Sequence, residues 1–169
     1  MTIGIDNGIS GALAAIYPDG TVEVVDMPVI SVGKANRIDA LAVYTWIKVA
    51  AAESGAPAFV TFEQGQKNPL FGTKGNYSNG YSCGVVETLI QFAARDGFVT
   101  YQCVNPRTWQ KDMFKDLRGV GDGDTKGASI EVCRRLFPQL SLVPPRCRLP
   151  HDGWADAICM AEYGRRHQA

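Results

Sequence analysis

The sequence predicts an α/β fold in which a mixed five-stranded sheet, three antiparallel strands followed by two parallel ones, carries helices on both faces. Three short apolar runs near the N-terminus are separated by turn residues, which predicts an antiparallel meander. Two later apolar runs alternate with segments of helical periodicity, which is typical of parallel strands joined by helices. At 169 residues, the chain is expected to form one domain, residues 1–169.

The predicted strands are defined by their apolar runs and by the turns that follow them. The first run ends in Asp-Asn-Gly, and Pro-Asp-Gly separates the second from the third. In the latter turn, proline presets φ and glycine supplies a positive φ. The five predicted strands are TIGIDNG (2–8), SGALAAIY (10–17), TVEVVDM (21–27), AFVTFE (58–63) and FVTYQCV (98–104).

The predicted helices follow from apolar spacing and from capping residues. Asn105 is a suitable N-cap before Pro106 at the first helical position, and Asp124 or Thr125 can cap a later helix. Segment 64–80 holds four glycines and one proline without periodicity, which predicts a long loop. Helices are expected at 36–53, 81–95, 106–114, 125–137 and from Asp152 onward.

The composition excludes several classes of protein. The N-terminus MTIGIDNGIS lacks the basic and apolar regions of a secretory signal, and no stretch approaches the roughly 18 apolar residues of a membrane span. The five cysteines are odd in number and include no C-x-x-C pair, so we expect reduced thiols rather than disulfides or a zinc site. These features predict a cytoplasmic protein that does not bind membranes.

Charge is unevenly distributed along a chain whose net charge is zero. Residues 1–63 hold three Lys or Arg and seven Asp or Glu, whereas residues 105–150 hold nine and five. Such a basic segment indicates a surface that binds a polyanion, and a solvated basic surface is the alternative.

Four carboxylates lie where solubility would not require them. Asp6 ends the first predicted strand, Glu63 ends the fourth, and Asp152 and Asp156 lie at i and i+4 on the apolar face of the last helix. Buried carboxylates need partners, and no cation stands next to Asp6 or Glu63 in the sequence. Divalent metal ions would satisfy all four acids, in the layout of two ions about 4 Å apart that hold one phosphodiester.

Each acid also has a simpler interpretation. Asp152 could be the N-cap of its helix, Asp6 could form an Asx-turn with the residues that follow, and Glu63 could be an exposed strand end. Asp156 is the hardest to explain in this way, because its neighbours on both sides are apolar. The four acids together therefore favour a metal site more strongly than any one of them does.

A resemblance to a known family rests on five segments in order: IGIDNGISGALA (3–14), VTFEQ (60–64), VNPRTWQKDMF (104–114), DTKGASIEVCRRLFP (124–138) and PHDGWADAICMAEYGRR (150–166). Together they resemble the RuvC-type Holliday junction resolvases, particularly the phage and prophage branch, within the RNase H-like nuclease superfamily. The resemblance implies an RNase H-like fold and a crossover junction endodeoxyribonuclease. Such an enzyme nicks four-way DNA junctions symmetrically and leaves 5′-phosphate ends, in recombination or phage DNA processing.

The resemblance also implies roles for the four acids. Asp6 would bridge two Mg²⁺ or Mn²⁺ ions, Glu63 would ligate one of them, and Asp152 and Asp156 would ligate the other. Cellular members of the family place their last two acids three residues apart, but here the residue three before Asp156 is Gly153. The phage-like spacing uses Asp152, either as a direct ligand or through a water. No small-molecule cofactor is implied.

Other residues of the family's site are matched less directly. Cellular members carry an aromatic residue soon after the acid of the fourth strand, which wedges the junction open, and Gln66 falls near that place. Phe71 or Tyr77 would substitute by stacking on an opened base, or would only pack the loop. His151 would orient a water or hold a phosphate, or would serve as a capping or surface residue.

Several cations are candidates for contacts with DNA phosphates, which position DNA without reading its sequence. Lys111, Lys115 and Arg118 recur at helical spacing and would face the DNA backbone. Lys126, near a helix start, is the favoured phosphate contact. Further candidates are Arg107 and, unless they only solvate their helix, Arg134 and Arg135.

A four-way junction offers two equivalent strands to cut, so the resemblance implies a two-fold homodimer. The helix from Gly80 to Arg95 is the expected interface, because Gly80 and Gly84 lie one turn apart and permit close approach. Packing of these glycines inside one subunit is the alternative.

Three other functions stay open. An RNase H-like nuclease that cuts flaps, other branched DNA or structured RNA would share the metal site. An actin-like nucleotide-binding domain would need a second phosphate loop, and none is evident. A DNA-binding module without catalysis is disfavoured, because the four acids repel phosphates unless metal is bound.

Overall fold

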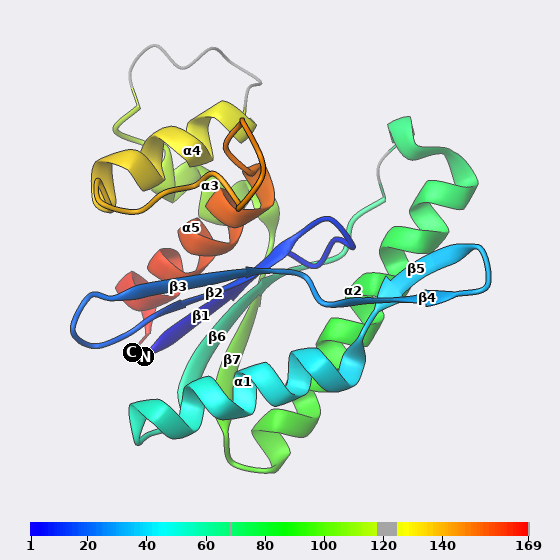
Figure 1. Ribbon diagram of the computed structural model, residues 1–169, viewed down its shortest axis with the longest axis horizontal. Helices are drawn as coiled ribbons and strands as arrows, with labels where there is room; N and C mark the ends of the chain where they lie inside the picture. The colour runs from blue at the N-terminus through cyan, green and yellow to red at the C-terminus, as the bar shows by residue number, and fades with distance from the viewer. Residues whose placement is uncertain (68, 118–124, 169) are drawn as a thin grey trace.

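Five strands form the central sheet of the computed structural model, which describes residues 1–67, 69–117 and 125–168 (Figure 1). Their order across the sheet is β3-β2-β1-β6-β7. Strand β1 pairs antiparallel with β2, which pairs antiparallel with β3, whereas β6 is parallel to both β1 and β7. The predicted sheet is therefore confirmed. The strands are β1 (Thr2–Ile5), β2 (Ala12–Ile16), β3 (Val22–Asp26), β6 (Ala58–Glu63) and β7 (Val99–Val104).

Helices cover both faces of this sheet, as predicted (Figure 1). Strand side chains alternate between the faces, so Ile3 and Ile5 pack with the helices on one side while Ala12 and Ala14 pack with those on the other. The first side is covered by α1 (Ala40–Ser54) and α2 (Gly72–Arg95), and the second by α3 (Pro106–Met113), α4 (Thr125–Leu136) and α5 (Asp152–His167). No helix of the described residues is long and apolar enough to cross a membrane.

Helix α5 packs unusually close to the sheet, because glycines lie at the contact on both the strand and the helix side. A Cβ atom at Gly4 of β1 would overlap the carbonyl oxygen of Ala157 and the amide nitrogen of Ala161. A Cβ atom at Gly164 of α5 would in turn overlap Oγ1 of Thr61 in β6. The helix therefore lies with its backbone directly against β1 and β6, and these contacts fix its position relative to the strand ends.

The helix predicted at 36–53 starts later, at Ala40, because Asp39 is the N-cap and accepts a hydrogen bond from the amide of Ala42 at 3.0 Å. The residues before it form a two-stranded hairpin that the sequence did not predict, β4 (Val29–Val32) and β5 (Ala35–Ile38). The apolar Ile38 fits the helical period as well as a strand, whereas β-branched residues in β4 favour a strand. Gly33, with a φ of 61°, makes the turn between the two strands.

The predicted loop at 64–80 is wrong over much of its length. A short 3₁₀ turn (η1, Pro69–Phe71) leads into α2, which begins at Gly72 rather than near residue 81. Each glycine in a helix is less favourable than alanine by about 1 kcal/mol, so the glycine-rich sequence of this segment did not predict a helix. Buried Val86, Ile90 and Ala93 anchor the later turns on the sheet, and helix formation extends cooperatively from such an anchored part.

The predicted helix caps differ in outcome. Asn105 caps α3 as predicted, since its side chain accepts a hydrogen bond from the amide of Arg107 at 3.0 Å. Thr125 is the first residue of α4, and Asp124, the other candidate cap, lies outside the described residues.

Candidate active site

The four predicted acids surround one cavity of about 650 Å³ at the carboxyl ends of β1 and β6. Asp6 follows β1 directly, and Glu63 ends the neighbouring parallel strand, whose register pairs Phe62 with Ile5. Asp152 and Asp156 lie in the first two turns of α5. Since α5 packs directly on β1, the fold brings acids from the two ends of the chain to one place.

Gly153 allows α5 to approach Asp6 closely. A Cβ atom at this position would lie 3.1 Å from Oδ2 of Asp6 and 3.0 Å from the carbonyl oxygen of Ser10. A side chain at residue 153 would therefore press against the strand-end carboxylate. The neighbouring acid, Asp152, instead lies at the rim of the cavity, with 38% of its side chain exposed.

Burial raises the pKa of three of the four carboxyls. It raises that of Asp6, against an opposing hydrogen bond from the amide of Gly8 at 3.1 Å, so Asp6 forms the predicted Asx-turn as well as facing the cavity. Burial also raises the pKa of Glu63 to about 6 and that of Asp156 to about 7. The negative charge of Asp6 adds to both of these shifts. The three acids therefore repel one another when ionised.

The chemistry of this donor set fits a hard divalent cation. Among the described residues, Asp6, Glu63 and Asp156 form no ion pair with a Lys, Arg or His. Carboxylate oxygens are the ligands that Mg²⁺ and Mn²⁺ prefer, and a bound cation would remove the repulsion. Within the described ranges, no three His, Cys, Asp or Glu side chains stand in ready metal-binding geometry.

Asp152 differs from the other three acids because it has a cationic partner. Its carboxylate forms an ion pair with Nζ of Lys126 on α4, which lowers the pKa of Asp152 and raises that of Lys126. Asp152 does not cap its helix. His151 is the N-cap, and its Nδ1 accepts a hydrogen bond from the amide of Trp154 at 3.2 Å. The capping alternative is therefore wrong for Asp152 and holds for His151.

Searches with the sequence matched no protein-family model and no curated protein. Solved structures do match. RuvC from T. thermophilus, in complex with a Holliday junction substrate, has a TM-score of 0.55 at 16% identity, over 98% of this chain and 94% of that chain. The yeast mitochondrial Holliday junction resolvase Ydc2 has a TM-score of 0.52 at 13% identity, over 98% and 77%. The chain has the RuvC-type, RNase H-like fold.

On this RuvC-type fold, two further side chains contact the acids, and the sequence predicted neither. Nε1 of Trp109, a fully buried residue of α3, donates a hydrogen bond to Oε1 of Glu63 at 2.8 Å. Oγ of Ser129 on α4 donates one to Oδ1 of Asp156 at 2.5 Å. A signal for Ser129 was present, since it follows Lys126 by three residues and so shares its helix face. Trp109 carried no comparable signal.

The candidate DNA-contacting cations differ in their distance from the cavity and in whether an acidic side chain pairs with them. Lys126 lines the cavity, and Arg107 is exposed directly after Pro106, which also lines it. Lys111 is exposed on α3 without an acidic partner among the described residues. Lys115 pairs with Asp112 at 3.2 Å. Of the remaining candidates, Arg135 pairs with Glu131, Arg134 is exposed, and Arg118 lies outside the described residues.

The prediction that Lys111, Lys115 and Arg118 recur along one helix is wrong for Lys115, because α3 ends at Met113, and Arg118 lies outside the described residues. Phe114 is the C-cap, and its ring packs edge-on against that of Trp109 at a centroid distance of 5.6 Å. This contact holds the chain where it leaves the helix.

The aromatic candidates after Glu63 also differ in position. Phe71 lines the cavity and is 54% exposed. Tyr77 is 67% exposed on α2 but is not part of the lining. Gln66 lies in the lining as well. Of the two aromatic residues, Phe71 is therefore better placed to meet a substrate in the cavity.

Proposed function

We propose that this protein is a Holliday junction resolvase, a metal-dependent endonuclease that nicks four-way DNA junctions symmetrically. The observation that carries the proposal is the cavity that gathers Asp6, Glu63, Asp152 and Asp156. The shared fold with a RuvC that was solved on a Holliday junction substrate supports the choice of DNA.

The four acids would hold two divalent cations, Mg²⁺ or Mn²⁺, which supply an activated water and stabilise the leaving 3′ oxygen. Trp109 and Ser129 orient Glu63 and Asp156 through the hydrogen bonds described above. Lys126 lies beside Asp152 at the cavity, where it would meet a phosphate of the scissile strand. The products would carry 5′-phosphate ends, as the resemblance to RuvC-type resolvases implies.

Two coordinated nicks require two active sites, and we propose a homodimer formed through α2. Gly80 and Gly84 are exposed on this helix, and a Cβ atom at either would meet no atom within 4 Å inside the subunit. This open space supports the use of the glycines for contact with a second copy rather than for packing inside one subunit.

The decisive experiment incubates the purified protein with a synthetic four-way junction, a flap and a linear duplex, with and without Mg²⁺ or Mn²⁺. Paired symmetric nicks only in the junction, lost in Asp6→Asn, are expected. Asp39→Asn is the matched control, because Asp39 caps α1 outside the cavity and asparagine caps equally well. Equal cutting of flap and junction would favour a broader branched-DNA nuclease, and no metal-dependent cleavage at all would refute the proposal.

A further inference from the structure

Three segments near the cavity carry positive charge and no acid. Residues 27–38, 64–82 and 137–151 contain no Asp or Glu, although the whole chain has 17 acidic and 17 basic residues. Their basic residues form no ion pair within the described part of the chain, in contrast to Lys126. These unpaired cations are Lys34, Arg37, Lys67, Lys74, Arg146 and Arg148.

One segment lines the cavity, and the other two are attached to elements that line it. Segment 64–82 lines it directly, with Lys67 among the lining residues. Segment 137–151, the connector between α4 and α5, is held by buried Leu142, whose carbonyl oxygen accepts a hydrogen bond from the amide of His151 at 2.9 Å. The β4–β5 hairpin is held to α2, where the guanidinium of Arg37 lies 4.3 Å from the ring centroid of Tyr81.

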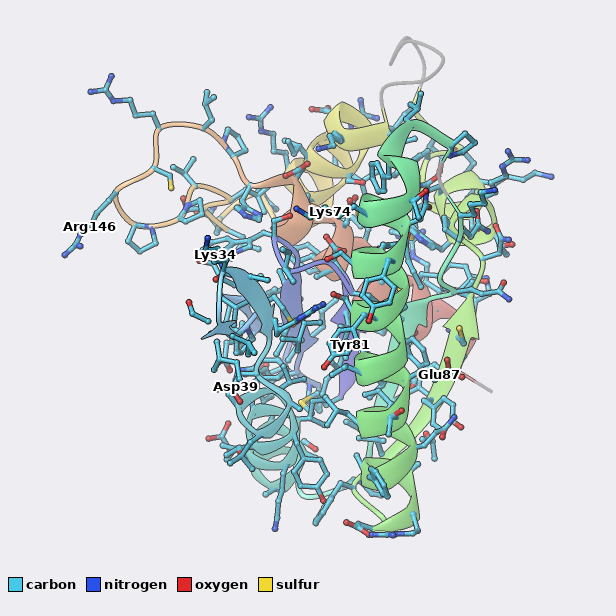
Figure 2. The ribbon with its side chains drawn as sticks, turned by 90° about the vertical axis from the view of Figure 1, so that its right-hand side faces the viewer. Lys34, Asp39, Lys74, Tyr81, Glu87 and Arg146 are labelled. Atoms are coloured by element: carbon cyan, nitrogen blue, oxygen red, sulfur yellow. The ribbon has the colours of Figure 1, made fainter. Side chains whose placement is uncertain are left out.

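The hairpin and the connector stand on opposite sides of the acidic strand end. In Figure 1, the loop after β1, which begins with Asp6, lies between the connector on one side and α2 with the hairpin on the other. In Figure 2, Lys34 and Arg146 both lie on the left-hand side of the molecule. The two segments therefore present exposed cations on one surface, to either side of the cavity.

These cations are placed at turns that hold them away from the protein body. Lys34 follows Gly33 at the hairpin tip, where the positive φ of 61° makes the turn. Arg146 itself has a positive φ of 68° and follows Pro144 and Pro145, which restrict the backbone before it. Neither cation has a role in packing, because both are exposed.

We infer that Lys34 of the hairpin, together with Arg146 and Arg148 of the connector, binds the phosphate backbones of DNA arms that leave the cavity in different directions. The choice of branched DNA as occupant rests on the proposed function. Contacts to phosphates need no particular base sequence and draw their affinity from the release of counterions. Cations on two sides of the cavity suit a junction, whose arms extend in more than one direction.

The test measures binding of a fluorescent four-way junction and of a linear duplex by anisotropy, in EDTA so that no metal-dependent cleavage occurs. The variants are Lys34→Gln, the pair Arg146→Asn and Arg148→Gln, and all three together. Asparagine is used at 146 because it tolerates a positive φ. Lys48→Gln on α1 is the control, since it removes the same charge from an exposed position outside the three segments. Circular dichroism melting verifies that each variant is folded.

The triple variant should bind the junction roughly tenfold more weakly than the wild type. A plot of log K against the logarithm of the salt concentration should also be less steep, by about 0.9 in slope for each phosphate that the protein no longer neutralises. Lys48→Gln should match the wild type. A triple variant that binds like Lys48→Gln would overturn the inference, even if the wild type cuts junctions.

Failure of the proposed function gives a different result. In one such case, the wild type cuts no junction and binds both DNAs equally, yet the triple variant binds them more weakly than the control does. The resolvase proposal would then be refuted, while the assignment of the three cations to DNA phosphates would stand. A wild type that cuts no junction and binds neither DNA, in EDTA or with Mg²⁺, would overturn both.

Discussion

Oγ of Ser129 lies 2.5 Å from Oδ1 of Asp156 and donates a hydrogen bond across the contact between α4 and α5. The bond favours the ionised carboxylate and so opposes the burial that raises the pKa of Asp156 to about 7. Ser129 is fully buried, and its hydroxyl also contacts the carbonyl oxygen of Thr125 at 3.2 Å. The ionisation of a proposed metal ligand thus depends on a neighbouring helix.

Ser129→Ala should raise the pKa of Asp156 further, because it removes an interaction with the charged form. The acidic limb of the pH–rate profile for metal-dependent junction cleavage should then move up by about one unit, and the free energy of unfolding should fall by about 1 kcal/mol. Ser141→Ala, in the exposed connector, is the control. An unchanged profile in Ser129→Ala would show that this hydrogen bond does not set the ionisation.

Trp109→Phe should raise the pKa of Glu63 above about 6, because the indole hydrogen bond opposes the effect of burial. We expect a lower kcat with unchanged affinity for DNA, and a decrease of about 1–3 kcal/mol in the free energy of unfolding. Trp46→Phe is a matched control, since its indole donates to Glu23 at 3.2 Å in an exposed place. Equal effects of the two substitutions on kcat would contradict a role for Trp109 at the cavity.

The metal-free protein should become less stable as pH rises from about 5 to 8. The folded-state pKa values of Asp6, Glu63 and Asp156 are raised, so the folded state binds more protons than the unfolded state between pH 3.8 and about 7. At about 1.4 kcal/mol per pKa unit, ionising Asp156 alone costs roughly 2–4 kcal/mol by pH 8.

Thermal unfolding in EDTA measures this effect. Asp156→Asn should raise Tm at pH 8 but not at pH 5, and Mg²⁺ should raise the wild-type Tm more at pH 8, where its ligands are deprotonated. If Tm in EDTA rises between pH 5 and pH 8, the claim that mutual repulsion of the ionised acids destabilises the metal-free protein is wrong.

Gly4→Ala should destabilise the protein by more than about 3 kcal/mol, because the added methyl group overlaps backbone atoms of α5 that cannot move aside. Gly84→Ala meets no atom within 4 Å and should stabilise the isolated subunit by about 0.5–1 kcal/mol through helix propensity. Chemical denaturation at low protein concentration compares the two. If α2 forms the proposed dimer interface, Gly84→Ala should also weaken dimerisation in analytical ultracentrifugation.

The sequence was sufficient where local pattern and tertiary structure agree. Apolar runs marked the five strands, and acids at the ends of two of them, together with Asp156 in an apolar helix, predicted the residues that line the cavity. The parallel pairing of β1 with β6, which the structure shows, places Asp6 and Glu63 at the same edge of the sheet.

The sequence was insufficient where tertiary contacts override local preference. The glycines in the first half of α2 made that segment look like a loop. The apolar Ile38 made the end of a hairpin strand look like the start of a helix. The partners of the acids are also tertiary, since Trp109 and Glu63 are 46 residues apart and Ser129 and Asp156 are 27 apart. No periodicity within one element reports contacts of this kind.

The backbone contact between Gly4 and α5 also has a consequence for the order of folding. The first strand and the last helix must meet before Asp6 and Asp156 share a cavity, and contacts between distant parts of a chain form slowly because a long loop has to close. A partly folded chain that has formed the meander but not docked α5 holds Asp6 without its helical partners. Such an intermediate has no assembled acid cluster and would therefore lack the proposed metal site.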